Sequence, residues 1–195
     1  MAVESAWYWI RHGPTNSRAL NGWTDIAADL SDTATLDWLR SRIPEVAVVV
    51  ASDLKRASAT ANAIAGNRIR LPDTKFLREF NFGEWEGKTP EQIALSHPEE
   101  SHAFWNDPTQ SSPPGGESWH ALSERVSGFV DALIERHPGR IMVAVSHFGT
   151  IMTQAHRAAN ADNSGLLSRS VQNLSLTRLT HRNGTWTLHE FSSLP

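Results

Sequence analysis

Residues 46–53 read Val-Ala-Val-Val-Val-Ala-Ser-Asp, an almost wholly apolar, valine-rich run that ends in two polar side chains. Such a run is typical of a central parallel strand, because a strand covered by helices on both faces has no solvent-facing side. Residues 141–147, Ile-Met-Val-Ala-Val-Ser-His, repeat this arrangement, and residues 7–12, Trp-Tyr-Trp-Ile-Arg-His, give a shorter version of it. Helical patterns lie between these runs. The sequence therefore predicts a three-layer α/β/α sandwich with a mainly parallel central sheet.

The segments between these strands carry helical signals. We expect helices over residues 33–42, 54–65, 118–137 and 149–159. Ser52 and Asp53 offer capping side chains to the second of them, and Gly66 fits its end. A short strand around residues 69–71 and a closing hairpin around Asn183-Gly184 complete the sheet.

The length and composition point to a single domain. The chain has 195 residues, with 39% hydrophobic and 20% charged, so residues 1–195 are expected to form one domain. Residues 80–118 are rich in glycine and proline and are predicted to form a lid-like, substrate-specificity insertion with a short helix near residues 91–96. A net charge of −3 argues against a nucleic-acid partner. With no apolar run long enough for a membrane and an acidic rather than basic N-terminus, a soluble cytoplasmic protein is expected.

The strongest functional signal is where three predicted strands end. The first runs into Arg11-His12, the second into Ser52-Asp53 with Arg56 one turn further on, and the third into Ser146-His147. Because the carboxyl ends of parallel strands share one edge of the sheet, two histidines and two arginines should surround one crevice. Such groups repel each other unless an anion is bound, and guanidinium forks match phosphoryl oxygens.

A phosphoryl group at this edge suggests a division of labour among the side chains. Neighbouring arginines lower the pKa of a histidine, and a neutral imidazole is a nucleophile toward phosphorus. A proton donor for the leaving group is also needed. Glu79, Glu84 and Glu86 all lie in an aromatic-rich segment where a carboxyl beside a phosphate would have a raised pKa. These physical arguments alone leave the three glutamates as alternatives.

Five ordered blocks of sequence resemble the histidine phosphatase superfamily, which includes the cofactor-dependent phosphoglycerate mutases. They cover roughly residues 6–160, and the length resembles the small-phosphatase branch. The blocks are Arg11-His12-Gly13-Pro14-Thr15, Ser52 to Ala61, Leu77 to Gly87, Gly115-Gly116-Glu117-Ser118 and Ser146-His147-Phe148-Gly149.

The resemblance assigns a role to each matching residue. It implies that His12 becomes a phosphohistidine and that Glu79 is the proton donor and later the base that activates water. Arg11, Arg56 and His147 would hold the phosphoryl oxygens. Thr15 would add a hydroxyl contact in the phosphate loop. No metal or other cofactor is implied, because the arginines neutralise the charge that Mg²⁺ neutralises elsewhere.

Two positions depart from the family pattern. Arg18 stands where the family often has asparagine, and Phe148 stands where glycine is usual. We expect Arg18 to add positive charge at the entrance of the pocket, unless another residue fills the asparagine's contact. We expect Phe148 to alter how the backbone approaches the phosphate.

The resemblance predicts a phosphomonoester hydrolase that acts on a small phosphorylated metabolite and releases inorganic phosphate. One alternative is a mutase, which returns the phosphoryl group to another oxygen of the bound intermediate. The family's mutases tend to be longer, and this chain ends soon after its last predicted strand, which favours hydrolysis. A catalytically silent phospholigand-binding module is the other alternative. It is disfavoured because all five core residues are present.

Overall fold

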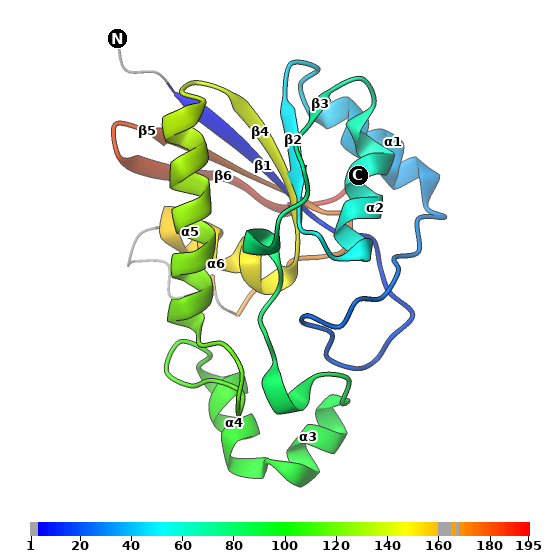
Figure 1. Cartoon of the computed structure of the whole chain (residues 1–195), viewed down its shortest axis with the longest axis vertical. Coiled ribbons are helices and arrows are strands. Elements are labelled where there is room, and N and C mark those ends of the chain that lie inside the picture. Colours follow the sequence, from blue (N-terminus) through cyan, green and yellow to red (C-terminus); the bar gives the residue numbers. More distant parts are fainter. Residues whose placement is uncertain (1–3, 160–164, 167) are drawn as a thin grey trace.

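The computed structural model describes residues 4–159, 165–166 and 168–195. Its strands form a single sheet in the order β3-β2-β4-β1-β5-β6, and the first four of these are parallel (Figure 1). β5 runs antiparallel to β1, and β6 runs antiparallel to β5. The strands are β1 (Ser5–Arg11), β2 (Val48–Ala51), β3 (Ile69–Arg70), β4 (Ile141–Ser146), β5 (Leu176–Arg182) and β6 (Thr185–Ser193).

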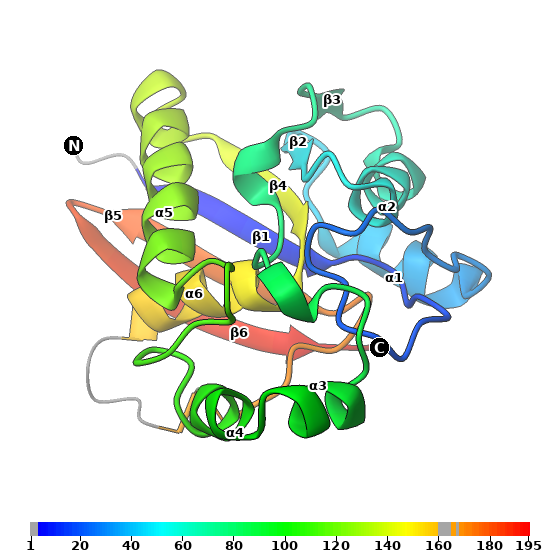
Figure 2. The ribbon, with the colours of Figure 1, turned by 60° about the horizontal axis from the view of Figure 1, so that its bottom comes forward.

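Helices cover both faces of this sheet. The helices α1 (Thr33–Arg42) and α2 (Lys55–Ala65) lie on one face, and α5 (Trp119–Arg136) and α6 (Phe148–Ala159) lie on the other (Figures 1 and 2). The predicted three-layer α/β/α sandwich with a mainly parallel sheet is confirmed. Within the described parts of the chain, no helix combines the length and the apolar character needed to cross a membrane.

The β1 strand shows why the predicted central strands are apolar on both of their faces. Trp7 and Trp9 are fully buried in the core that also holds residues of α5 and α6. Ile10, on the opposite face, is buried with residues of α1 and α2, and Tyr8 packs against the same cluster. Because both faces are covered, a polar side chain in the middle of this strand would be costly, and Ser5 and Arg11 lie at its two ends.

Residues 80–118 extend beyond the edge at which β1 and β4 end. The sequence predicted one short helix there, but the structure has two, α3 (Pro90–Ser96) and α4 (Pro98–Asn106), which lie together at the lower end of the molecule (Figures 1 and 2). Pro98 begins the second helix at its first turn, where a proline is tolerated. A small apolar cluster of Trp85, Ile93 and Phe104 holds this segment together.

The start of α2 corrects a second prediction. Ser52 and Asp53 do not cap the helix. Its N-cap residue is Leu54, whose side chain makes no capping hydrogen bond. Instead the Asp25 carboxylate, from the loop after β1, accepts a 2.7 Å hydrogen bond from the Lys55 amide. Asp53 is engaged elsewhere, in two 2.7 Å hydrogen bonds from Arg78. A carboxylate distant in sequence thus replaces the local cap.

Candidate active site

Five predicted site residues meet at the carboxyl edge of the sheet. The register pairs Arg11 of β1 with Ser146 of β4, so His12 and His147, the next residue of each strand, are neighbours. Their ring centres are 5.0 Å apart. Arg56 reaches His12 from the first turn of α2, and Glu79 reaches the start of α6 from the irregular segment after residue 77. The structure therefore brings together the side chains that the sequence placed at or just after three strand ends, and it adds Glu79 from the aromatic-rich segment.

His12 is held in one tautomer, and its unprotonated nitrogen contacts Arg56. Its Nδ1 lies 2.7 Å from the Gly13 carbonyl oxygen, which only accepts hydrogen bonds, so Nδ1 carries the proton. Its Nε2 is then the unprotonated nitrogen and accepts a hydrogen bond from Arg56 Nε at 3.2 Å. Burial, with smaller contributions from Arg56 and Arg11, lowers the pKa of His12 to about 3. The imidazole is neutral near pH 7, mainly because it is buried and not because arginines surround it.

Arg56 fixes the loop that follows β1. Its side chain is 1% exposed and donates to the backbone carbonyls of Asn21, Gly22 and Thr24 at 2.7–2.8 Å. Together with the contact to His12, these bonds use all three guanidinium nitrogens. Arg56 therefore determines both the surroundings of His12 and the path of the loop.

His147 and Arg11 present unused polar atoms to the same space. Both ring nitrogens of His147 and the Nε of Arg11 are buried and have no hydrogen-bond partner within the described residues. Arg11 also donates a hydrogen bond from Nη1 to the Val171 carbonyl oxygen at 2.6 Å. Burial, followed by the nearby His12, Arg56 and Arg11, lowers the pKa of His147 well below its usual value. Unsatisfied buried donors of this kind indicate a place for an acceptor such as a phosphoryl oxygen.

Glu79 differs from the other two candidate glutamates in its contacts. Its two carboxylate oxygens accept from the Gly149 amide at 2.9 and 3.0 Å, at the N-terminus of α6. Glu84 is an exposed side chain beside His97. Glu86 accepts from the amides of Gly22, Trp23, Thr24 and Phe82 and so braces the same loop that Arg56 holds. Of the three alternatives, only Glu79 binds the Gly149 amide and lines the pocket together with Phe148.

Three further residues were predicted to contact the phosphate or the substrate, namely Thr15, Arg18 and Phe148. Thr15 is half-buried and Arg18 is exposed, and in the described residues no polar contact links either of them to His12. Phe148 begins α6 and lies under Arg11, whose guanidinium carbon is 5.8 Å from the centre of the ring. Phe148 also forms part of the wall of the pocket that leads away from Glu79.

That pocket has a volume of about 790 Å³ and is predominantly aromatic. It opens between the end of the sheet and the α4 segment. Its described lining consists of Glu79, Phe80, Phe82, Phe104, Trp105, Asn106, Asp107, Pro108, Thr109, Trp119, Phe148, His156 and Ser168. The reacting end therefore has the cationic groups and Glu79, and the far end is aromatic with one carboxylate, that of Asp107.

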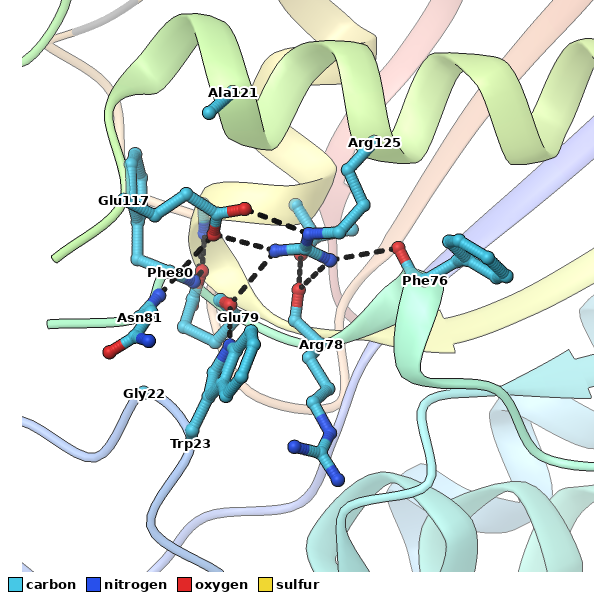
Figure 3. Close-up of polar contacts among 12 residues, drawn as sticks. Gly22, Trp23, Phe76, Arg78, Glu79, Phe80, Asn81, Glu117, Ala121 and Arg125 are labelled. Atoms are coloured by element: carbon cyan, nitrogen blue, oxygen red, sulfur yellow. Dashed lines mark hydrogen bonds and ion pairs between the residues drawn. The ribbon is translucent and has the colours of Figure 1, made fainter.

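Sequence reasoning missed one residue that supports the site. Arg125, on α5, contacts the backbone around Glu79 and pairs with Glu117 (Figure 3). A signal was present, because Arg125 follows Leu122 by three residues and precedes Phe129 by four, on the apolar side of the predicted helix. A charged residue at such a position needs a partner when it is buried.

A parallel sheet edge that carries two guanidinium groups, two imidazoles and a carboxyl group around one space defines an α/β enzyme of phosphoryl transfer. The chain belongs to the histidine phosphatase superfamily (branch 1), whose family model matches residues 7–193.

Similarity to known proteins supports this family assignment. The chain is 30% identical to phosphoglycerate mutase-like protein 4 of Arabidopsis thaliana, over 76% of this chain and 69% of that protein. It is 29% identical to the metal-independent phosphoserine phosphatase of the same plant, over 95% and 80%. The solved structure of Bacillus stearothermophilus YhfR is 26% identical and superimposes with a TM-score of 0.86, over 98% of each chain. The chain spans 34% of some longer mycobacterial proteins that it also matches.

Proposed function

We propose that this protein hydrolyses phosphomonoesters through a phosphohistidine formed on His12. The observation that carries the proposal is the state of the His12 imidazole. It is neutral, its tautomer is fixed by Gly13, and its Nε2 faces buried cationic groups. Relatives that are named as phosphatases support the same reaction class.

The first step transfers the phosphoryl group to the protein. Nε2 of His12 forms a bond to phosphorus while the bond from phosphorus to the ester oxygen breaks, and Glu79 gives its proton to that oxygen. In the second step Glu79 takes a proton from water, the water oxygen attacks phosphorus, and the bond to His12 breaks. Inorganic phosphate leaves and the imidazole returns to its starting state.

The surrounding groups stabilise the charge that develops on the phosphoryl oxygens. Arg11 and Arg56 supply positive charge, and His147 supplies a hydrogen bond, in a region from which water is largely excluded by burial. Thr15, Arg18 and Phe148 remain proposed contacts to the phosphate or to the substrate. The guanidinium groups take the charge-neutralising role, so the mechanism is written without a metal.

The pocket supports a particular kind of leaving group. Its described lining has no lysine or arginine, whereas it has several aromatic rings and the carboxylates of Glu79 and Asp107. A second anionic group on the substrate would find no lysine or arginine in that lining and only the imidazole of His156, whereas an uncharged planar or apolar group would stack on Trp105 or Phe148. We therefore expect a small phosphorylated metabolite with an uncharged alcohol, and we assign residues 80–118, in one domain spanning residues 1–195, to its recognition.

Mutase activity and silent binding are the alternatives. A phosphoglycerate carries a carboxylate beyond its phosphate, which this pocket does not match. A module that only binds phosphate would not need an unprotonated Nε2 on His12. Comparing kcat/KM for phenyl phosphate and 3-phosphoglycerate, together with an assay for 2-phosphoglycerate, separates these cases. We expect the aryl ester to be favoured at least about tenfold, and efficient phosphoglycerate interconversion would overturn the hydrolase assignment.

The decisive experiment traps the intermediate. Wild-type protein is mixed with p-nitrophenyl phosphate in chelator-treated buffer, quenched in alkali and analysed for phosphate bound to His12. Phosphohistidine is stable in alkali and labile in acid, so acid treatment should remove the bound phosphate. The His12→Asn variant should bind no phosphate covalently and should have no activity. His120→Asn is the matched control, because that imidazole is exposed on α5. A folded His12→Asn variant with near wild-type turnover would refute the mechanism.

A further inference from the structure

The segment that carries Glu79 lacks the support of regular secondary structure. Lys75–Leu77 is a single 3₁₀ turn, and the residues that follow, up to residue 82, are neither helical nor paired in the sheet. A proton donor must be held within a fraction of an ångström of the bond it serves, and displacement by about 1 Å costs about a hundredfold in rate. Contacts from elsewhere must therefore hold the backbone of Glu79.

Arg125 of α5 supplies several of these contacts, alongside the Thr150 hydroxyl, which donates to the Arg78 carbonyl at 2.7 Å, and the Ser146 hydroxyl, which donates to the Leu77 carbonyl at 2.7 Å. Its guanidinium group donates to the carbonyl oxygens of Phe76 at 2.9 Å, Arg78 at 3.1 Å and Glu79 at 3.2 Å (Figure 3). The five N–H groups of a guanidinium lie in one plane and point in fixed directions, so one side chain can hold several carbonyls of one segment. Trp23 Nε1 donates to the same Glu79 carbonyl at 3.0 Å from the opposite side.

Glu117 orients Arg125 and holds the other end of the segment. Its carboxylate accepts from Arg125 Nε at 2.8 Å and from a terminal nitrogen at 2.7 Å, a bidentate pair. The same residue is bonded twice to Asn81, through its backbone N–H at 2.8 Å and through its carboxylate at 3.3 Å. The side chains of Arg125 and Glu117 are only 16% and 13% exposed, so solvent screens this pair weakly.

We propose that Arg125 and Glu117 are positioning residues that set the location of the Glu79 carboxyl group. Contacts from this pair reach the chain on both sides of Glu79, at Arg78 and Asn81, and at the Glu79 carbonyl itself. Neither residue is among those that line the pocket. The proposal rests on the proposed role of Glu79 as proton donor, and it deepens that role by naming what places the donor.

The test uses the chemistry of the leaving group. A p-nitrophenolate ion departs with little help from an acid, whereas an alkoxide needs a proton. The parameter to measure is kcat/KM, because it reports the steps up to formation of the phosphoenzyme and leaves out its later hydrolysis. We expect Arg125→Lys to lower kcat/KM for glycerol 2-phosphate about tenfold more than for p-nitrophenyl phosphate. Lysine keeps the positive charge but cannot reproduce the planar set of donors.

Two further variants keep the proposal falsifiable. Glu117→Gln, which keeps the size of the side chain, should give the same leaving-group dependence in a smaller degree, and it serves if Arg125→Lys fails to fold. Arg157→Lys is the matched control, because Arg157 pairs with Asp131 between α6 and α5 outside the pocket lining. It should change both substrates equally or not at all. An equal loss for both substrates in folded Arg125→Lys and Glu117→Gln would show a merely structural role and overturn the proposal.

The same measurement on Glu79→Gln separates this proposal from the function on which it rests. If Glu79→Gln shows the selective loss with glycerol 2-phosphate and the Arg125 and Glu117 variants do not, the positioning proposal is wrong and the donor role stands. If Glu79→Gln itself shows no selectivity, the donor role is wrong, and the positioning proposal falls with it.

Discussion

Arg56 Nε donates a hydrogen bond to His12 Nε2 over 3.2 Å, so the lone pair proposed to attack phosphorus is held by a guanidinium group. The other nitrogens of Arg56 are bound to three loop carbonyls, which prevent the guanidinium from swinging away. We expect the oxygens of an entering phosphate to compete for the Nε proton and so to free the lone pair. The contact would then link arrival of the substrate to release of the nucleophile.

This arrangement predicts that Arg56 cannot be replaced by lysine. Arg56→Lys keeps one positive charge but has no planar group with which to reach His12 and three carbonyls at once. We expect kcat/KM for p-nitrophenyl phosphate to fall by about 10²–10³. Limited proteolysis should also cut the loop of residues 14–32 faster than in the wild type. Activity within a few-fold of the wild type would mean that charge alone suffices.

Acidification below pH 6.5 should destabilise the fold through the two histidines of the site. The pKa of His12 is lowered to about 3 and that of His147 is also well below its unfolded value near 6.5. Below pH 6.5 the unfolded chain binds protons that the folded chain does not, so stability is complete above that pH and falls as the pH falls. Each histidine contributes a slope of about 1.4 kcal/mol per pH unit in this window.

Urea unfolding between pH 5 and 6.5 measures this slope. Asp53, whose pKa is lowered mainly by its hydrogen bond with Arg78, loses its stabilising effect only at lower pH. His147→Gln should reduce the slope by about one proton's contribution. Unfolding free energies that stay flat over this pH window in the wild type would contradict the neutral, buried state of the two imidazoles.

The strands were predictable because their signal is local. A parallel strand that is covered on both faces must be apolar at each position, and β4 spans Ile141–Ser146, the predicted apolar run. His12 and His147 were predictable for the same reason, since they are the first residues beyond two such strands. The ends of parallel strands meet whatever the details of the helices are.

What the sequence did not predict depends on contacts between distant segments. The cap of α2 comes from Asp25, 30 residues before the Lys55 amide that it binds. Glu86 and Arg125 act on the backbone of loops whose paths are set only by tertiary packing. No local pattern states which carbonyl a long polar side chain will reach, so these roles emerge only from the folded chain.

Gly149 should tolerate no side chain, for a reason that concerns Glu79. A β-carbon there would lie 2.5 Å from Glu79 Oε1 and 2.5 Å from the Phe80 ring. Gly149→Ala should therefore displace the carboxyl group and lower kcat/KM at least about tenfold. Circular dichroism should show an intact fold.

Gly128→Ala is the control for that substitution. Gly128 lies in α5, and apart from its chain neighbours and the adjacent helix backbone, no atom lies within 4 Å of the position where its β-carbon would be. The change should leave activity unaltered and stabilise the helix by about 0.5–1 kcal/mol, measured by urea unfolding. If Gly149→Ala is as active as Gly128→Ala, the carboxyl group of Glu79 is not confined in the way that the structure indicates.

The two helices on one face of the sheet offer a matched pair of cap removals. Asp32 caps α1 through the Thr35 amide at 3.0 Å, and Asp25 plays the same part for α2 through the Lys55 amide at 2.7 Å. Asp32→Ala and Asp25→Ala should each cost about 1 kcal/mol of stability. Only Asp25→Ala should also impair activity, by roughly three- to tenfold in kcat/KM. The reason is that Arg56 lies in the turn that Asp25 anchors, and a misaligned catalytic group lowers the reaction rate. Parallel urea unfolding and steady-state kinetics on both variants test this. Equal stability losses with equal activities would show that the start of α2 holds Arg56 in place without Asp25.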